Sequence, residues 1–459
     1  MIEDVIAETV AYALGRNLTE VLFPQNRKPI PNLTDIYELE LAFYENLILT
    51  DEQLIRNGAY FSRIDGQYTR HFLMCAGEPL KLPDHSSSRL KSFFAKNIFR
   101  TGYATHGLFP YRGKFHPQMI KGLINVMGLK PGDTVLDPMA GSGTVPVEAC
   151  LMGIRSIGVD VSPFCRFMTQ TKIDALTMPL ARAKAALFNY EPVFAYFQKR
   201  VGRPLQGSKP YRTKPDKDPM AVMEEMASYA ADKDSTALTI QEQDTLNTYN
   251  LLLLAYLDSA GYAERSVRKA PLELFRAILE RYLFVTEKIQ KVLAGLEKEI
   301  APAVVMEGDA RALALENQSV EGIIFSPPYS FAIDYLANDS FHLNFMGINT
   351  ETLRERMIGL RGRNLLERYQ SYREDMGKVL SECARVLRSG RFCTIVVGTN
   401  SNQLAKVMGV SSDEVMGLHE ILIDMSAAKG FKTLKVISRP IVGMSNTMRR
   451  EYILILQKT

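Results

Sequence analysis

Two short motifs in the 459-residue chain combine residue types that could bind a nucleoside and act on an amino group. The first runs Asp137-Pro138-Met139-Ala140-Gly141-Ser142-Gly143-Thr144, between a predicted buried strand and a predicted helix. Glycines allow a ligand to approach the backbone closely, and the first turn of a helix has free N–H groups. The carboxylate of Asp137 would repel a phosphate, so it suits a ligand with a cationic or amino group.

A second acidic residue supports this interpretation. Asp160 directly follows the next predicted strand, Ser156–Val159. In nucleotide-binding β-α-β units an acidic residue at this position reaches the ribose hydroxyls. The ligand indicated has a nucleoside and an amino acid moiety but no pyrophosphate, and S-adenosylmethionine fits. The alternative is that the glycines only form a tight turn.

The other motif is Phe325-Ser326-Pro327-Pro328-Tyr329, after the apolar run Gly322–Phe325. Two successive prolines cannot continue a central strand or a helix, so they present Ser326 and Tyr329 rigidly. Ligands of open α/β sheets bind at this carboxyl edge. The alternative is a polyproline turn with a packing tyrosine.

With both motifs in view, the chain resembles the amino-methyltransferases of DNA, the adenine-N6 and cytosine-N4 class. There, Asp/Ser/Asn-Pro-Pro-Tyr/Phe/Trp at a strand end is the catalytic signature. The segment 106–117 resembles the one that closes over the methionine end of the cofactor, and Gly308-Asp309 resembles the acidic position near the adenine ring. The resemblance covers roughly residues 102–165 and 302–459.

The resemblance implies S-adenosyl-L-methionine as cofactor and direct methyl transfer to a flipped base. The implied catalytic residues are Ser326, Pro327, Pro328 and Tyr329. The implied cofactor-binding residues are Lys114, Phe115, His116, Asp137, Pro138, Gly141, Ser142, Gly143, Thr144, Asp160 and Asp309. Within the family, Ser at the first motif position favours cytosine N4, with adenine N6 as the alternative. A carbon-5 methyltransferase would need a cysteine nucleophile where this chain has Ser326.

The elements that must position these motifs follow an α/β pattern. Predicted strands are Thr134–Asp137, Ser156–Val159, Val304–Met306, Gly322–Phe325, Phe392–Val397, Phe431–Ile437 and Glu451–Leu456. Predicted helices beside them are Gln118–Met127, Val145–Met152, Leu365–Leu387, which Ser389-Gly390 would close, and His419–Ala428. We therefore expect a Rossmann-like class I methyltransferase fold, a doubly wound, mainly parallel seven-stranded sheet.

The predicted domains follow from where this pattern breaks. Residues 102–165 and 302–459 form the expected methyltransferase domain, and 166–301 a helical insertion with helices at Ala181–Tyr196, Ala221–Ala231 and Leu272–Ile300. Residues 1–101 form an N-terminal extension of unassigned role, with helical patterns at Val5–Leu14 and Asp35–Leu49.

Charge points to a polyanionic partner. The net charge is +4, and residues 199–217 hold seven basic residues against one acidic. This basic loop makes the insertion the candidate target-recognition region. Two roles are open for it: it reads the bases, or it contacts the phosphates only. A second cluster is interleaved with glutamates, which favours either a salt-bridged helical face or another DNA-binding surface. Its members are Arg354, Arg356, Arg361, Arg363 and Arg368.

Double-stranded DNA is the expected partner, with a companion restriction endonuclease. No signal peptide, membrane span, metal site or secreted disulfide framework is read, so a cytoplasmic setting is expected. The five cysteines, at 75, 150, 165, 383 and 393, are expected in the core. Two other functions stay open: an RNA base amino-methyltransferase, and a degenerate methyltransferase fold that binds nucleic acid without catalysis.

Overall fold

The computed structural model describes most of the chain. The described residues are 18–31, 33, 35–76, 88, 91, 102–111, 113–200, 220, 223–224, 227, 238–265, 270–295, 300–328, 334–411, 415–441 and 450–459. Four sequence predictions fall outside this part. They are the helix Val5–Leu14, nearly all of the basic loop 199–217, most of the helix Ala221–Ala231, and Tyr329.

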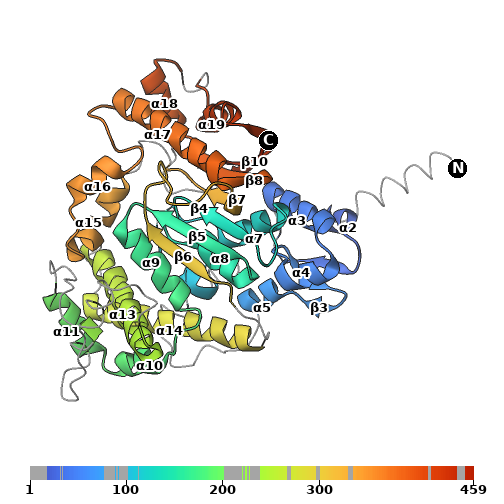
Figure 1. Ribbon diagram of the computed structural model, residues 1–459. Coiled ribbons are helices and arrows are strands. Elements are labelled where there is room, and N and C mark those ends of the chain that lie inside the picture. The colour runs from blue at the N-terminus through green and yellow to red at the C-terminus, as the bar shows by residue number, and fades with distance from the viewer. Residues whose placement is uncertain are drawn as a thin grey trace, which may run out of the picture.

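One seven-stranded sheet organises the molecule, with strand order β6-β5-β4-β7-β8-β10-β9 (Figure 1). Its strands are β4 (Thr134–Asp137), β5 (Arg155–Asp160), β6 (Ala303–Glu307), β7 (Val320–Phe325), β8 (Leu387–Gly398), β9 (Phe431–Pro440) and β10 (Arg450–Lys458). The first five pair in parallel, and β10 runs antiparallel to both of its neighbours. The predicted fold class and strand number are confirmed.

Alternating side chains of the central strands separate two cores, as the two-residue period of a strand requires. In β7, Ile323 and Phe325 face a core with α17 (Leu365–Val386), α18 (Ser401–Met408) and α19 (Leu418–Ala427). Ile324 between them faces the opposite core, with α7 (Pro117–Val126) and α8 (Thr144–Met152). Both faces of the sheet are therefore covered. A ligand can reach the cofactor motif and the catalytic motif only at an edge of the sheet.

The N-terminal segment packs on the α7 side of the sheet. Its elements are α2 (Leu18–Leu22), β1 (Arg27–Pro29), α3 (Ile36–Ile48), α4 (Asp51–Asn57), β2 (Phe61–Ile64), β3 (Gln67–Tyr68) and α5 (Arg70–Ala76). The three strands form a small antiparallel sheet. Leu41 and Phe61 are fully buried in the same core as Ile120, so the described part of this extension is built onto the sheet domain.

Helices dominate between β5 and β6, as predicted. They are α9 (Pro163–Asp174), α10 (Ala181–Phe188), α11 (Tyr190–Lys199), α13 (Ile240–Arg265) and α14 (Pro271–Gly295), and α10 to α14 gather at the lower left of Figure 1. The expected insertion boundary at 165/166 falls inside α9. The single helix expected over Ala181–Tyr196 is divided at Asn189, because Pro192 lacks the N–H that would bond to Phe188.

One of the remaining elements precedes α7, and the other two follow the catalytic motif. They are η1 (Ala104–Gly107), α15 (Tyr335–Phe345) and α16 (Thr350–Arg356). The expected helix stop at Ser389-Gly390 is wrong, because β8 already begins at Leu387 and includes both residues. None of the described helices combines the length and the apolar character that a membrane crossing requires.

The second arginine cluster is largely neutralised by carboxylates from elsewhere in the fold. Arg354 pairs with Asp334 at 2.8 Å, and Arg356 pairs with Glu307 at 3.2 Å. Arg361 pairs with the buried Asp375. The salt-bridged interpretation is thus supported, although these partners are tertiary neighbours and not the interleaved glutamates.

Candidate active site

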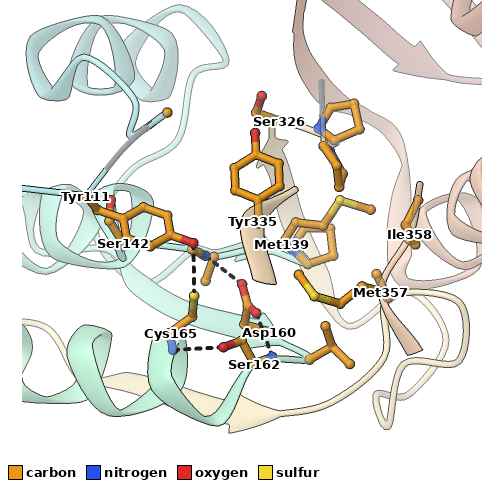
Figure 2. A pocket seen from close by; sticks show the side chains of 18 of the residues that line it. Tyr111, Met139, Ser142, Asp160, Ser162, Cys165, Ser326, Tyr335, Met357 and Ile358 are labelled. Carbon is orange, nitrogen blue, oxygen red and sulfur yellow. Dashed lines mark hydrogen bonds between the residues drawn. The ribbon is translucent and has the colours of Figure 1, made fainter. Parts of the chain in front are cut away.

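A cavity opens where β4, β5 and β7 end, because the carboxyl ends of parallel strands meet at one edge (Figure 2). It holds about 940 Å³ of space free of protein atoms, counting its open mouth. Eleven of the residues predicted from the sequence line it: Lys114, Phe115, Pro138, Gly141, Ser142, Thr144, Asp160, Asp309, Ser326, Pro327 and Pro328. The fold thus brings the cofactor motif and the catalytic motif to one space.

Asp160 holds the turn that follows β4 as well as facing the cavity. One carboxylate oxygen accepts the backbone N–H of Gly141 at 2.8 Å, and the other accepts that of Ser162 at 2.8 Å (Figure 2). Burial raises the pKa of this carboxyl to about 6, although both hydrogen bonds oppose the shift. The group is mainly ionised at neutral pH, which suits an acceptor for ribose hydroxyls.

The two motif glycines have different reasons to be glycine. Both have positive φ, +49° at Gly141 and +75° at Gly143, where residues with a Cβ are strained. A Cβ on Gly141 would meet nothing nearer than 3.8 Å and would occupy the cavity wall beside Tyr111. A Cβ on Gly143 would lie 2.6 Å from the Thr169 side chain. Gly143 therefore serves the packing of α8 on α9, and it does not line the cavity.

Asp137 and His116 also lie outside the lining. Asp137 is fully buried, accepts the Met139 backbone N–H at 3.0 Å, and has its pKa raised by burial. Its other carboxylate oxygen has no hydrogen-bond partner in the described part of the chain. His116 is buried at the N-cap of α7.

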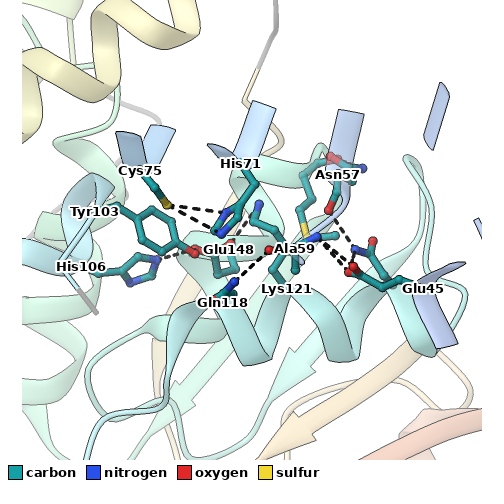
Figure 3. Close-up of polar contacts among 12 residues, drawn as sticks. Glu45, Asn57, Ala59, His71, Cys75, Tyr103, His106, Gln118, Lys121 and Glu148 are labelled. Atoms are coloured by element: carbon teal, nitrogen blue, oxygen red, sulfur yellow. Dashed lines mark hydrogen bonds and ion pairs between the residues drawn. The ribbon is translucent and has the colours of Figure 1, made fainter. Parts of the chain in front are cut away.

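The described residues of segment 102–116, which we call the strap, contribute Tyr111, Gly113, Lys114 and Phe115 to one wall of the cavity. Lys114 donates to the backbone carbonyl of His106 at 3.1 Å, and burial lowers the pKa of its ammonium to about 8. The start of the strap is anchored to α8 through Glu148, which is fully buried. Glu148 accepts from Tyr103 at 2.6 Å and pairs with His106 at 2.7 Å (Figure 3).

Lys121 completes this buried network from α7, 3.1 Å from the second Glu148 oxygen. Burial would raise the pKa of Glu148, but Lys121 and the hydrogen bonds lower it to about 2. His106 thus belongs to the anchor of the strap and not to the cavity lining.

The catalytic motif begins at the last residue of β7. Every residue of β7 is buried, Pro327 is buried, and Ser326 and Pro328 are half-buried on the cavity wall. Because two prolines end the strand, Ser326 and the Pro327 carbonyl stand at a fixed place relative to Gly141 and Asp160. Tyr329 lies outside the described residues.

Asp309 lines the cavity, but Arg311 already engages its carboxylate at 2.6 Å. Burial would raise the pKa of Asp309, and Arg311 outweighs that effect and lowers it. Arg311 therefore largely balances the charge of the Asp309 carboxylate. Such a carboxylate suits a neutral ring, such as adenine, more than a cation.

Sequence reasoning missed several lining residues. Tyr111 of the strap donates to Asp339 of α15 at 3.1 Å, and the Cys165 thiol lies 3.5 Å from the Tyr111 oxygen. Tyr335 lines the same space one helical turn before Asp339 (Figure 2). The four-residue spacing of Tyr335 and Asp339 just after the catalytic motif was the available signal. All five cysteines are buried as expected, but Cys165 also lines the cavity.

The lining fits S-adenosylmethionine by its chemistry. Carboxylates of Asp160 and Asp339 face the cavity, and acceptors of this kind suit a ribose and a cationic ligand. The open space beside Gly141 is one that a Cβ would fill. Among the described residues, no group of three or more His, Cys, Asp or Glu side chains is placed to hold a metal ion.

Residues 108–244 match the family model described as UPF0020, RMKL-like, methyltransferase domain. Two curated relatives are Type II methyltransferases. M.BsoBI of Geobacillus stearothermophilus is 22% identical over 54% of this chain and 54% of its own length. M.MjaII of Methanocaldococcus jannaschii is 43% identical over 15% of this chain and 13% of its own length.

A third relative acts on RNA by its name. It is the tRNA (guanine(10)-N2)-dimethyltransferase of Methanothermobacter thermautotrophicus, 42% identical over 12% of this chain and 16% of its own length. This chain therefore spans about half or less of each of these three relatives. Among solved structures, a SAM-dependent methyltransferase from Methanosarcina mazei aligns over 72% of this chain and 94% of its own, with TM-score 0.31 and 10% identity.

The family model and the curated relatives that match this chain are methyltransferases by name, and S-adenosylmethionine is the cofactor that they indicate. By name they include two Type II methyltransferases and a tRNA dimethyltransferase, so they leave the acceptor undecided.

Proposed function

We propose that this chain transfers a methyl group from S-adenosylmethionine to an exocyclic amine of a DNA base, with cytosine N4 as the favoured acceptor. Adenine N6 is the alternative within the same proposal. One observation carries the proposal: Ser326, Pro327 and Pro328 line the same cavity as Gly141 and Asp160. A companion restriction endonuclease belongs to the proposal, because two relatives carry Type II names.

The chemistry requires the amine to become a nucleophile. Its lone pair is delocalised into the base ring, and acceptors that hold both amine hydrogens favour a pyramidal nitrogen. The Ser326 hydroxyl and the Pro327 carbonyl are the acceptors that the end of β7 offers. When bound, S-adenosylmethionine supplies an electrophilic methyl group on a positively charged sulfur.

The rest of the cavity positions the reactants and excludes water. Asp160 orients the nucleoside part of the cofactor, and the Gly141 turn allows close approach. The apolar side chains of Met139, Met357 and Ile358 line the same space. No covalent enzyme intermediate is required, because the amine itself attacks the methyl group. Burial also raises the pKa of the Cys165 thiol well above its usual value, so this cysteine is not activated as a nucleophile.

A second acceptor class, RNA, is favoured by one specific observation. The relative with 42% identity over its matched region is named a tRNA (guanine(10)-N2)-dimethyltransferase. An RNA amine at guanine N2 could be held by the same pair of acceptors.

Nucleoside mass spectrometry distinguishes these functions. DNA and RNA would be isolated from a host that expresses the chain and, as the matched control, from one that expresses Ser326→Ala. N4-methylcytosine in DNA with the parent chain alone is the expected result. N6-methyladenine would support the alternative base, and methylguanosine in RNA would support the RNA reaction. If the two hosts have the same modified nucleosides, the proposal is wrong.

A further inference from the structure

We infer that Tyr282 of helix α14 is a positioning residue of the cofactor site, which it serves by fixing the backbone of the strap at Phe109. The inference rests on the cofactor part of the proposed function. It concerns a residue 173 positions from Phe109 in sequence, in the helical region between β5 and β6.

A buried chain of hydrogen bonds joins the two segments. The Tyr282 hydroxyl accepts the backbone N–H of Phe109 at 2.8 Å and donates to Asp258 of α13 at 3.1 Å. Arg281 donates to the same Asp258 oxygen at 2.7 Å. Tyr282 is fully buried, and Phe109 is 4% exposed, so water cannot substitute for these bonds. Burial raises the pKa of Tyr282 well above its usual value, which keeps the hydroxyl protonated for this double role.

Phe109 needs such a partner because of its backbone. Its φ is +47°, in the left-handed region that a residue with a Cβ rarely adopts. Its ring is fixed by edge contacts with Phe164 and His342, each at 5.2 Å between ring centroids. Packing and the Tyr282 hydrogen bond together hold a conformation that the local sequence disfavours.

The backbone conformation of Phe109 determines where Tyr111, a residue of the cavity wall, is placed. The Phe109 carbonyl accepts the backbone N–H of Tyr111 at 2.9 Å, which closes a tight turn around Pro110. Tyr111 then lines the cavity, reaches Asp339 at 3.1 Å, and lies next to Gly141 of the cofactor turn. Only Pro110 therefore lies between the residue that Tyr282 holds and Tyr111 on the cavity wall.

Helix α14, which contacts the strap, belongs to the region that we expect to bind nucleic acid. Residues 166–301 include the basic loop expected to contact nucleic acid, and α13 and α14 share a core with Leu108 and Phe109. The Tyr282 bond is thus a direct physical link between that helical region and the cofactor site.

The test compares two variants of the full chain, Tyr282→Phe and Tyr249→Phe. Tyr249 is the matched control, since it is equally buried on the neighbouring α13 but packs against Phe197. Three quantities would be measured: the Kd for S-adenosylmethionine by calorimetry, the Tm, and hydrogen exchange of the Phe109 amide. Removing the hydroxyl leaves a buried N–H without an acceptor. For Tyr282→Phe we expect about a tenfold higher Kd and faster exchange at Phe109.

The expected control result is the parent Kd and parent exchange at Phe109 in Tyr249→Phe, even if its Tm falls. If the parent chain binds the cofactor and Tyr282→Phe binds it with the same Kd, the inference is wrong. Equal weakening of binding in both variants would also overturn it, because that pattern indicates general destabilisation. Absence of cofactor binding by the parent chain would contradict the proposed function itself, while exchange at Phe109 would still report whether Tyr282 fixes the strap.

Discussion

The carboxylate of Asp160 accepts the backbone N–H of Gly141 at 2.8 Å. The residue that ends β5 therefore shapes the turn after β4, in addition to facing the cavity. Because Asp160 both holds this turn and lines the cavity, we expect substitutions there to affect the turn and the proposed cofactor binding together.

Cofactor affinity is expected to depend on pH through Asp160. Its carboxyl has a pKa of about 6, raised by burial. The ionised form is the better acceptor for ribose hydroxyls, so the affinity for S-adenosylmethionine should fall as the pH drops through 6 and level off above it. Calorimetry from pH 5 to pH 8 measures this. Asp160→Asn should bind more weakly at neutral pH with a flatter profile, and a parent profile without any change near pH 6 would contradict the assignment.

Gly143→Ala and Gly141→Ala are expected to fail in different ways. At Gly143 the new Cβ would meet Thr169 at 2.6 Å in a backbone conformation with positive φ. We expect a loss of unfolding free energy of about 2 kcal/mol or more. At Gly141 the Cβ has room, so the stability loss should be smaller and the weakening of cofactor binding larger. Thermal unfolding beside calorimetry separates the two, and identical behaviour of both variants would refute the distinction.

Ser326→Ala should lower turnover more than nucleic-acid affinity. A hydrogen bond from the reacting amine strengthens as the nitrogen becomes pyramidal, so it stabilises mainly the transition state. We expect the single-turnover rate to fall by roughly 10- to 100-fold, a loss of about 1.4–3 kcal/mol. Ser319→Ala is the control, because Ser319 precedes β7 at its opposite end and bonds to Glu316. Equal rates for the Ser326 variant and the parent would exclude this role.

Glu148→Gln is expected to destabilise the fold by about 3–5 kcal/mol, since it leaves Lys121 buried without its charge partner. The pKa of Glu148 is lowered from 4.5 to about 2. A lowered pKa stabilises the folded state above pH 4.5, and this contribution is lost as the pH falls towards 2. The stability difference between parent and variant should therefore shrink in acid.

Urea unfolding at pH 7 and at pH 3 measures this difference. The double variant Lys121→Met/Glu148→Gln should recover part of the loss, because it removes both charges. If the double variant is no more stable than Glu148→Gln alone, the buried ion pair does not account for the effect.

Neutralising Lys209, Arg212 and Lys214 together should weaken DNA binding and reduce its salt dependence. Each lost phosphate contact should lower the slope of log affinity against log salt by about 0.9. These residues lie outside the described part of the chain, whereas Arg354, Arg356 and Arg361 are ion-paired. Binding titrations at several salt concentrations, with cofactor affinity as the control, measure the effect. An unchanged slope would place the DNA-binding surface elsewhere.

Local sequence patterns were enough to predict the sheet and both strand-end motifs. The strands at Thr134–Asp137 and Gly322–Phe325 are apolar runs with clear ends, and parallel strands bring their carboxyl ends to one edge. Helix α13 was missed, and the helix expected at Ala181–Tyr196 is two helices. The hydrophobic periodicity of α13 is a weaker signal than that of α17, and Pro192 divides the other segment.

The sequence by itself determined the fold class and which residues end the strands, because hydrophobic period, proline and glycine act within a few positions. Only the tertiary structure decided what stands beside those residues. Phe109 and Tyr282 are 173 positions apart, and Arg361 pairs with Asp375 in place of an interleaved glutamate. Such contacts depend on how helices pack over the whole chain, and a local pattern does not encode that packing. For the same reason Gly143, read from its motif as a ligand contact, is a packing residue against Thr169.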